Sequence, residues 1–455
     1  MKKFDIVILG AGPGGYTLAS ILAQNDKKVA IIEKNKLGGT CVNYGCIPTK
    51  TLINEINFLN KAKKHDGIDI DDLNKFYLFM KKRMNKNSET LQKNIKNLLL
   101  SSKVDIFQGN GHVINENTLL VNKEKIHFEK LIIATGSRAR DLNIENANEM
   151  RRRKILLTSN DVLRLKTIPK SITIIGAGPI SLEFAYILNS LKTKVTILET
   201  SKKIFSRFSD EVASFLKKWL IKNKINFFEN VILKKFEKNK LFFQIDNEEI
   251  NIKTDKYFAA IGRIPNINDV KNLNLELNPN KSIKVDNKMK TSVKNVYAIG
   301  DVNGLLGITT SAYKHGDIVA KDILGFSNNE IFDPLLVPNT IFINPELSFV
   351  GLNEQQLLNQ NIEYVKINVP GAKLPRNYVE NANLESFFEL YLDKSNLRIL
   401  GSTIALKDSS LLINHMADLI KQKKTIFDLQ ENAYSHPTLA EAFYYLSRNF
   451  VFRKK

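Results

Sequence analysis

Short apolar runs that end at glycine are the clearest pattern along this chain. Residues 4–9 are apolar except for Asp5, which predicts a short buried strand. A glycine-rich turn at 10–15 and an apolar-periodic segment to about residue 23 follow, and a second apolar run occupies 29–33. This order predicts a strand, a glycine turn, a helix and a second strand, which together form one βαβ unit.

The same pattern returns further along the chain. Residues 172–175 predict a strand that leads into Gly176-Ala177-Gly178-Pro179-Ile180-Ser181, a helix through Leu188 and a strand at 195–199. Both units end in a glutamate, and Glu33 and Glu199 each lie 23 positions after the first glycine of their unit. An internal repeat of this kind predicts two dinucleotide-binding domains.

The remaining segments predict further helices and strands. Lysine-rich stretches at about 49–64 and 71–100 have helical periodicity, and short alternating segments at 111–121 predict a small β part. From about residue 336 the pattern changes to strands mixed with helices. We therefore expect an α/β fold with two Rossmann-like domains and a separate α+β C-terminal domain.

Composition agrees with a folded protein of several domains, because 43% of the 455 residues are hydrophobic and 25% are charged. The formal charge of +20 comes from lysines scattered along the whole length. This distribution indicates a basic surface, and no nucleic-acid partner is expected. No apolar run is long enough for a membrane span and the N-terminus lacks a signal-peptide pattern, so we expect no membrane association and a cytoplasmic location.

The two glycine turns predict the binding of two dinucleotides. Backbone N–H groups of such a turn can approach a pyrophosphate at the helix N-terminus, and the glutamate after the second strand accepts hydrogen bonds from ribose hydroxyls. In the second unit Ser181 replaces the third glycine. That change adds a small side chain between helix and strand and leaves the phosphate-facing positions unchanged.

Glu199 also bears on the choice of nucleotide. A carboxylate at this position pairs with a free 2′-hydroxyl and repels the 2′-phosphate of NADP, so NAD is predicted at the second site. The nearby Lys202, Lys203 and Arg207 keep NADP open as an alternative. Glu199 would also fit a purely structural place at the end of a strand.

The only two cysteines, Cys41 and Cys46, lie close together. They are too few for a disulfide framework or a four-thiolate metal site. Pro48 suits the first position of a helix, so Cys46 is predicted at a helix N-terminus, where the dipole lowers the pKa of a thiol. A redox-active pair is favoured over two buried structural thiols, and Gly45 allows the two sulfurs to meet.

Thiol chemistry also needs a base, and His436 is the candidate, because the ordinary pKa of histidine lies close to neutral pH. Glu441 fits a carboxylate that orients the imidazole. Thr438 and Glu441 also match a helix capping box, which is a structural alternative. No metal site is predicted, because no metal-ligand spacing links the other histidines, His65, His112, His127, His315 and His415.

Taken together, these motifs resemble the flavin-dependent pyridine nucleotide-disulfide oxidoreductases. They span the chain in the family's order: Gly10–Gly15, Gly38-Gly39-Thr40-Cys41 through Cys46-Ile47-Pro48-Thr49-Lys50, Ala134-Thr135-Gly136, Gly300-Asp301 and His436-Pro437-Thr438. Within the family the chain is most similar to the dihydrolipoamide dehydrogenases. The resemblance implies an FAD-binding domain at 1–142 and 264–335, an NAD-binding domain at 143–263 and a C-terminal dimerisation domain at 336–455.

The resemblance also implies roles for single residues. Cys46 is similar to the sulfur beside the flavin and Cys41 to the sulfur that exchanges with substrate. Lys50 resembles a lysine near the flavin that pairs with a glutamate, here Glu183, although both would also fit exposed helix charges. In the family the histidine that His436 resembles comes from the partner subunit, which implies a homodimer. The predicted cofactor-binding residues are Gly10, Gly12, Gly14, Gly15, Glu33, Gly39, Thr40, Thr135, Gly136, Gly300 and Asp301 for FAD, and Gly176, Gly178, Glu199 and Gly262 for NAD.

The implied reaction is oxidation of a dihydrolipoamide-type dithiol by NAD, with the dithiol free or carried on a lipoyl domain of a 2-oxoacid dehydrogenase complex. Tyr434 departs from that subfamily, which usually has a histidine two residues before the catalytic one. An NAD(P)H-dependent reductase of small disulfides, similar to glutathione reductase, is the alternative. An NADH oxidase and a basic nucleic-acid-binding or adhesive flavoprotein are minor alternatives.

Overall fold

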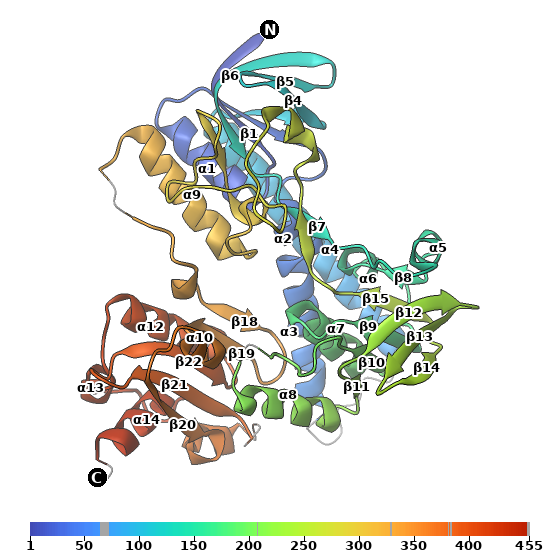
Figure 1. Ribbon diagram of the computed structural model, residues 1–455, viewed down its shortest axis with the longest axis vertical. Helices are drawn as coiled ribbons and strands as arrows, with labels where there is room; N and C mark the ends of the chain where they lie inside the picture. Colours follow the sequence, from blue (N-terminus) through green and yellow to red (C-terminus); the bar gives the residue numbers. More distant parts are fainter. Residues whose placement is uncertain (64–71, 207, 328–329, 381, 383–384, 453–455) are drawn as a thin grey trace.

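A computed structural model describes residues 1–63, 72–206, 208–327, 330–380, 382 and 385–452. His65 and Arg207, and the ends of both lysine-rich stretches, lie outside the described residues. Figure 1 shows three bodies, each built around a sheet, with the first and second at the top and right and the third at the lower left. The predicted α/β fold with two Rossmann-like domains and an α+β C-terminal domain is confirmed.

The first body contains a sheet of strand order β3-β2-β1-β6-β5-β4, and β17 pairs with β6. The strands β3, β2, β1, β6 and β17 run parallel to one another, while β5 pairs antiparallel with β6 and β4 pairs antiparallel with β5. Their bounds are β1 (Lys2–Leu9), β2 (Val29–Glu33), β3 (Asp105–Gln108), β4 (Gly111–Asn115), β5 (Thr118–Val121), β6 (Glu124–Ile133) and β17 (Val296–Ala298).

Strand β1 is buried on both faces, which explains its continuous apolar run. Ile6 and Ile8 belong to a core shared with helices α1 (Pro13–Gln24) and α9 (Thr309–Leu324), which pack on each other. Phe4 and Val7 belong to the core on the opposite face. Since β17 and α9 come after the whole second body in sequence, the first body is assembled from two stretches of chain.

The cysteine segment forms two helices, α2 (Gly39–Tyr44) and α3 (Cys46–Ala62). A third helix, α4 (Leu73–Ser101), packs against both. The helix expected to start at Pro48 begins earlier, at Cys46, so Pro48 is its third residue. Proline is tolerated there because N–H groups of the first turn have no partner within the helix. Cys46 still lies at the N-terminus of α3, as the sequence predicts.

The second body repeats the parallel arrangement with strand order β11-β10-β9-β15-β8. A short ribbon of β7 and β16 connects it to the first body, and an antiparallel sheet of β12, β13 and β14 lies at its edge. The bounds are β7 (Ser137–Ala139), α5 (Ala147–Arg152), β8 (Leu156–Leu157), α6 (Ser159–Val162), β9 (Ser171–Ile175), α7 (Pro179–Ser190), β10 (Lys194–Leu198), α8 (Asp210–Lys222), β11 (Asn226–Phe228), β12 (Ile232–Glu237), β13 (Lys240–Ile245), β14 (Glu248–Ile252), β15 (Lys256–Ala259) and β16 (Arg263–Pro265).

The third body is an antiparallel sheet of order β18-β19-β22-β21-β20 with helices packed against it. The bounds are β18 (Asn339–Ile341), β19 (Leu347–Gly351), α10 (Glu354–Asn359), β20 (Tyr364–Pro370), α11 (Pro375–Val379), β21 (Phe387–Asp393), β22 (Ile399–Ala405), α12 (Ser409–Lys421), α13 (Ile426–Glu431) and α14 (Glu441–Val451). Short 3-10 turns complete the chain at Asn268–Leu273 (η1), Gly300–Asn303 (η2), Pro334–Leu336 (η3) and Gly371–Lys373 (η4).

Candidate active site

The two glycine turns have the same geometry. Gly10 and Gly176 adopt positive φ angles of 111° and 95°, and a Cβ at either position would lie within 2.7 Å of a carbonyl oxygen of the neighbouring strand's loop. Glycine is therefore required where the two loops cross. A Cβ at Gly12 or Gly178 would meet no atom within 4 Å, so the helix N-termini at these two residues are open. This open backbone fits a pyrophosphate at each turn.

Glu33 and Glu199 hold their glycine turns in matching ways. One carboxylate oxygen of Glu33 accepts the N–H of Ala11 at 2.9 Å, and one of Glu199 accepts the N–H of Ala177 at 2.7 Å. The other oxygen of each glutamate accepts an N–H two residues further along the chain. Each oxygen keeps a second lone pair, so both carboxylates remain able to accept a ribose hydroxyl.

The third position of the motif differs between the two turns. A Cβ at Gly15 would lie 2.0 Å from the oxygen of Gly10. In the second unit Ser181 stands at this position, fully buried, and its hydroxyl makes no hydrogen bond within the described chain. The buried serine is thus accommodated within the packing of the second unit.

The cysteine segment lies against the first glycine turn. Gly38 donates its N–H to the oxygen of Ala11 at 2.8 Å, and a Cβ at Gly39 would lie 2.7 Å from the Cα of Gly12. Cys41 on α2 is half-buried, and Cys46 at the start of α3 is exposed. The two thiols lie close enough for each to shift the pKa of the other. The spacing of four residues therefore allows the two side chains to interact.

The surroundings of Cys46 favour its thiolate. Interaction with the Cys41 thiol, a hydrogen bond from Thr309 at 3.5 Å and the positive charge of Lys50 lower the pKa of Cys46 to about 6, against the opposing effect of partial desolvation by the surrounding protein. The pKa of Cys41 is raised, because its thiol donates to Cys46 and because it is partly buried. Cys46 is thus the thiolate of the reduced pair and Cys41 is its protonated partner.

Lys50 and Glu183 meet although they belong to different bodies. Lys50 Nζ lies 2.7 Å and 2.8 Å from the two carboxylate oxygens of the buried Glu183. The N–H of Phe342, which follows β18, donates to the same carboxylate at 3.1 Å, and the Lys50 ammonium lies 4.5 Å from the Phe342 ring centroid. These residues are therefore not independent exposed helix charges.

A polar network surrounds Asp301 on η2. Ser137 donates its hydroxyl to Asp301, and Arg263 Nε donates to the Ser137 hydroxyl oxygen at 2.7 Å. Close by, the Thr135 hydroxyl donates to the Asn266 carbonyl at 2.6 Å. Ser137, Arg263 and Thr309 were not predicted from the sequence, because each comes next to Cys46 or Asp301 only through the packing of distant segments.

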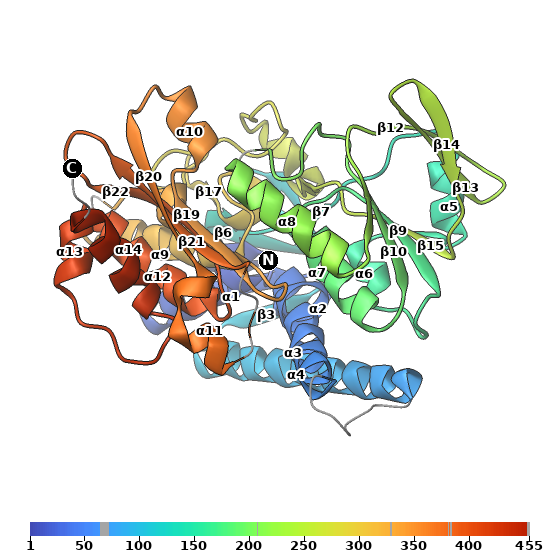
Figure 2. The same ribbon diagram turned by 90° about the horizontal axis from the view of Figure 1, so that it is seen from below.

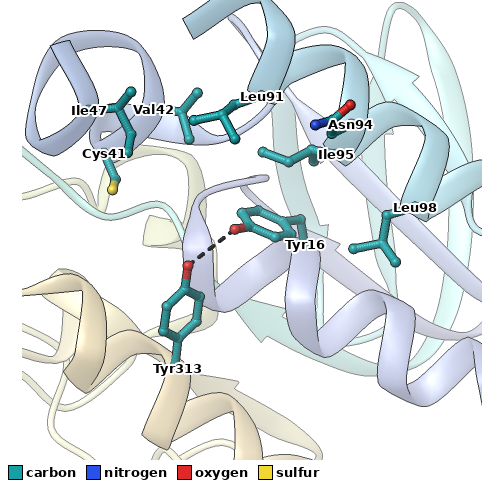
Figure 3. A pocket seen from close by; sticks show the side chains of 9 residues that line it. All are labelled: Tyr16, Cys41, Val42, Ile47, Leu91, Asn94, Ile95, Leu98 and Tyr313. Atoms are coloured by element: carbon teal, nitrogen blue, oxygen red, sulfur yellow. Dashed lines mark hydrogen bonds between the residues drawn. The ribbon is translucent and has the colours of Figure 1, made fainter. Parts of the chain in front are cut away.

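Beside Cys41 lies a pocket of about 310 Å³ (Figure 3). Its wall contains no charged residue, and its lining residues are Tyr16, Cys41, Val42, Ile47, Leu91, Asn94, Ile95, Leu98 and Tyr313. Tyr16 on α1 and Tyr313 on α9 point their hydroxyls at each other, 3.2 Å apart. The sequence carries no signal for this pair, because its two members are 297 residues apart.

His436 and Glu441 form the predicted pair in the third body. His436 Nδ1 lies 2.8 Å from one oxygen of Glu441, and the other oxygen accepts the N–H of Thr438 at 3.0 Å. The hydroxyl of Thr438 donates instead to the Ser435 carbonyl, so only one half of a capping box forms. The carboxylate thus orients the imidazole and satisfies the turn before α14 at the same time.

The position of this pair matters for the site. The side chain of His436 is 68% exposed, while that of Glu441 is buried. Both views show α13 and α14 at the left, within the third body, and α2 and α3 in the middle of the molecule (Figures 1 and 2). The side chain of His436 contacts Glu441, and none of its hydrogen bonds or ion pairs within the described part of the chain involves a residue of α2 or α3.

Tyr434 belongs to the α13–α14 connection itself. Its ring packs against Phe443 and His415, with centroid separations of 5.5 Å and 6.3 Å, and its hydroxyl donates weakly to the Leu429 carbonyl at 3.4 Å. Tyr434 is thus part of the packing that supports the α13–α14 connection.

Two other kinds of site are absent from the described residues. None of the helices in that part of the chain combines the length and the apolar character needed to cross a bilayer. No group of three or more His, Cys, Asp or Glu side chains among these residues converges as metal ligands would.

Comparison with known proteins agrees with this geometry. The chain is 31% identical over 444 residues to a dihydrolipoyl dehydrogenase of Mycoplasma genitalium, with 96% of both chains covered. It is 31% identical over 450 residues to a dihydrolipoyl dehydrogenase of Geobacillus stearothermophilus, with 96% of this chain and 94% of the relative covered. Among solved structures, the HOCl-induced flavoprotein disulfide reductase RclA from Escherichia coli matches with a TM-score of 0.86 at 26% identity, over 99% of this chain and 100% of that chain.

Two family profiles cover nearly the whole sequence. The profile described as pyridine nucleotide-disulphide oxidoreductase matches residues 4–316, and the profile of that family's dimerisation domain matches residues 337–446. The chain therefore belongs to the pyridine nucleotide-disulphide oxidoreductases and is an oxidoreductase that uses FAD and NAD.

Proposed function

We propose that this protein oxidises dihydrolipoamide-type dithiols with NAD, through the pair Cys41 and Cys46. In this proposal residues 1–142 and 264–335 hold FAD, residues 143–263 hold NAD, and residues 336–455 form the dimer interface. The open glycine turns at Gly12 and Gly178 support the two nucleotide sites. When bound, FAD accepts the electron pair of the reduced cysteines and NAD takes it up as hydride.

The substrate proposal depends on the pocket beside Cys41. Its wall is made of aliphatic and aromatic side chains with a single amide, Asn94. A lipoyl-type dithiol is a short uncharged aliphatic chain and can be buried there at little desolvation cost. Glutathione disulfide carries several carboxylates, and burying these without cationic partners would be strongly unfavourable.

The thiol chemistry follows from the two cysteines. One thiol of the substrate, as its thiolate, attacks the sulfur of Cys41 in the disulfide state, and the Cys41–Cys46 bond breaks. Cys46 leaves as the thiolate that its low pKa favours. The second substrate thiol then attacks the mixed disulfide, so the substrate departs as a cyclic disulfide and Cys41 recovers a thiol. The substrate loses two electrons and the cysteine pair gains them.

The base for this exchange is His436 of the partner subunit. Its exposure and its orientation by Glu441 support a site shared between two subunits, since none of the described contacts of His436 involves a residue of α2 or α3. The match to a dimerisation domain over residues 337–446 agrees with this arrangement.

NAD is the proposed nucleotide because of the residues around Glu199. The carboxylate is fixed by the N–H groups of Ala177 and Ser201, where a 2′-phosphate would meet its negative charge. Lys203, one of the two described lysines next to it, is engaged in an ion pair with Asp210. A cytoplasmic location and a lipoyl domain of a 2-oxoacid dehydrogenase complex as the physiological partner complete the proposal.

Steady-state kinetics with a panel of substrates test this function. We expect turnover of dihydrolipoamide with NAD, and at least tenfold lower kcat/KM for reduction of glutathione disulfide or coenzyme A disulfide with NADH or NADPH. Higher kcat/KM for a charged disulfide would contradict the substrate assignment and favour a small-disulfide reductase. The structural relative RclA is named a flavoprotein disulfide reductase, which is compatible with that alternative.

Subunit hybrids test the shared site. Homodimers of Cys46→Ser and of His436→Ala should each be inactive with dithiol. After the two are mixed and allowed to exchange subunits, a site shared between chains leaves one intact site per hybrid dimer, and activity returns to about a quarter of the wild-type value. If His436 acted on its own chain, every site would carry a defect and no activity would return.

A further inference from the structure

His315 is the most deeply buried histidine of the described chain, and the proposed chemistry does not use it. It lies on α9, the helix that packs against α1 and its glycine turn, and its side chain has no exposed surface. The Phe332 ring covers it edge-on, with a centroid separation of 4.3 Å. A histidine so completely enclosed needs partners for both of its ring nitrogens.

The hydrogen bonds of His315 fix its tautomer. Nδ1 accepts the backbone N–H of Gly300 at 3.1 Å, and the side-chain NH₂ of Asn303 lies 3.2 Å from the same nitrogen. The hydrogen must therefore sit on Nε2, which donates to the Ser311 hydroxyl at 3.3 Å. Burial lowers the pKa of His315 to about 4, so the ring is neutral at physiological pH and its Nδ1 lone pair stays available.

These contacts fix a turn that faces the proposed flavin site. Gly300 opens η2 with a φ of 71°, and Asp301 follows it directly. Asn303 closes the turn: its side chain donates to the Ala298 carbonyl at 3.1 Å and accepts the N–H of Leu305. His315 thus contacts both ends of the turn: the backbone N–H of its first residue, Gly300, and the side-chain amide of its last residue, Asn303. Without it, a buried N–H and a buried amide would both lose an acceptor.

We propose that His315 is a positioning residue for FAD: as a neutral acceptor it holds the Gly300–Asn303 turn in the geometry that presents Asp301 to the cofactor. The proposal rests on the prediction from the sequence that Asp301 binds FAD. It concerns cofactor retention and is independent of which dithiol is the substrate. Removal of the acceptor should loosen the turn and weaken FAD binding, while an uncharged acceptor in the same place should preserve it.

Two variants of His315 distinguish the effect of its hydrogen-bond acceptor from the effect of its side-chain volume. His315→Leu fills the space without an acceptor, and His315→Asn offers Oδ1 where Nδ1 stood. Apoprotein of each is titrated with FAD, with the loss of flavin fluorescence as the signal. We expect the Kd of His315→Leu to rise at least tenfold and that of His315→Asn to stay within about threefold of wild type. Thermal unfolding of the apoproteins, measured in parallel, should differ little between the two variants.

Asp301→Asn serves as the reference, since it should weaken FAD binding by itself if Asp301 has its proposed role. If it does not, the role of Asp301 is wrong whatever the result at His315. Equal Kd values for wild type, His315→Leu and His315→Asn would overturn the proposal, as would equal weakening in both variants. If His315→Leu does not fold, Ser311→Ala decides: loss of the Nε2–H partner should raise the Kd about threefold, and an unchanged Kd would overturn the proposal.

Discussion

Lys50 and Glu183 are 133 residues apart in the sequence, yet they form a two-point ion pair at the place where all three bodies meet. Lys50 comes from the helix that starts at Cys46, and Glu183 comes from α7 of the second body. The positive charge of Lys50 lowers the pKa of Cys46. The ion pair therefore holds one of the charges that set the protonation state of the cysteine pair.

Replacing Lys50 and replacing Glu183 should shift the pKa of Cys46 in opposite directions. Lys50→Met removes a positive charge and should raise this pKa by about one unit, whereas Glu183→Gln removes a compensating negative charge and should lower it slightly. A pH titration of the long-wavelength thiolate–flavin absorption band in the two-electron-reduced protein gives both values. Shifts of the same sign and size would show that the pair supports the fold alone.

The sequence predicted what local spacing determines. Glu33 and Glu199 stand at a fixed distance from their glycine turns, so the βαβ geometry that brings each carboxylate to its turn follows from the pattern alone. Cys41 and Cys46 are separated by four residues, and this short spacing allows their thiols to interact. The start of α3 was misplaced by two residues, because proline is accepted at any position of the first helical turn.

Contacts between distant segments could not be predicted in this way. Lys50 and Glu183 were paired only through the family resemblance, since nothing in their own surroundings distinguishes them from other helix charges. Tyr16 and Tyr313 join helices α1 and α9, and Thr309 reaches Cys46 only because α9 packs on α1. His315 has no motif of its own, and its place depends on the turn that it holds.

Thr309 should tune Cys46 through a single hydrogen bond. Thr309→Val keeps the shape of the side chain but removes the hydroxyl that donates to the thiolate, so the pKa of Cys46 should rise by about one unit. Thr309→Ser keeps the hydroxyl and is the matched control. The same absorption titration reports the change, and equal midpoints for Val and Ser at this position would contradict the role of the hydroxyl.

Because the pKa of Cys46 is lowered, the direction in which the thiolate–flavin absorption band changes with pH can be predicted. The thiolate is the dominant form above about pH 6, so the thiolate–flavin band should be present at neutral pH and should disappear as the pH falls through about 6. Cys41→Ser keeps a hydroxyl donor and cannot form the disulfide, so this variant should show the band without reductant. Cys46→Ser should show no band at any pH. Persistence of the band in Cys46→Ser would refute the assignment of the thiolate to Cys46.

Glu441 has two hydrogen-bonding roles that two substitutions can separate. Glu441→Gln keeps an acceptor for the Thr438 N–H but loses the charge that orients and stabilises the His436 imidazolium, so dithiol turnover should fall about tenfold with little change in thermal stability. Glu441→Ala loses both contacts and should also unfold at lower temperature. His436→Ala should cut dithiol turnover by about 10² or more. NADH-to-dye activity should be unaffected in all three, and a parallel loss there would place the defect outside thiol exchange.

The charge of Glu199 should determine the preference for NAD over NADP. Glu199→Gln keeps an acceptor for the N–H of Ala177 but removes the negative charge that would repel a 2′-phosphate. The ratio of kcat/KM for NAD over NADP should therefore fall by about tenfold, mainly through a lower KM for NADP. Glu199→Asp retains the charge and should keep the preference, even if the shorter side chain weakens the binding of both nucleotides. An unchanged ratio in Glu199→Gln would mean that the carboxylate serves the glycine turn alone and that specificity arises elsewhere, with Lys202 as the next residue to test.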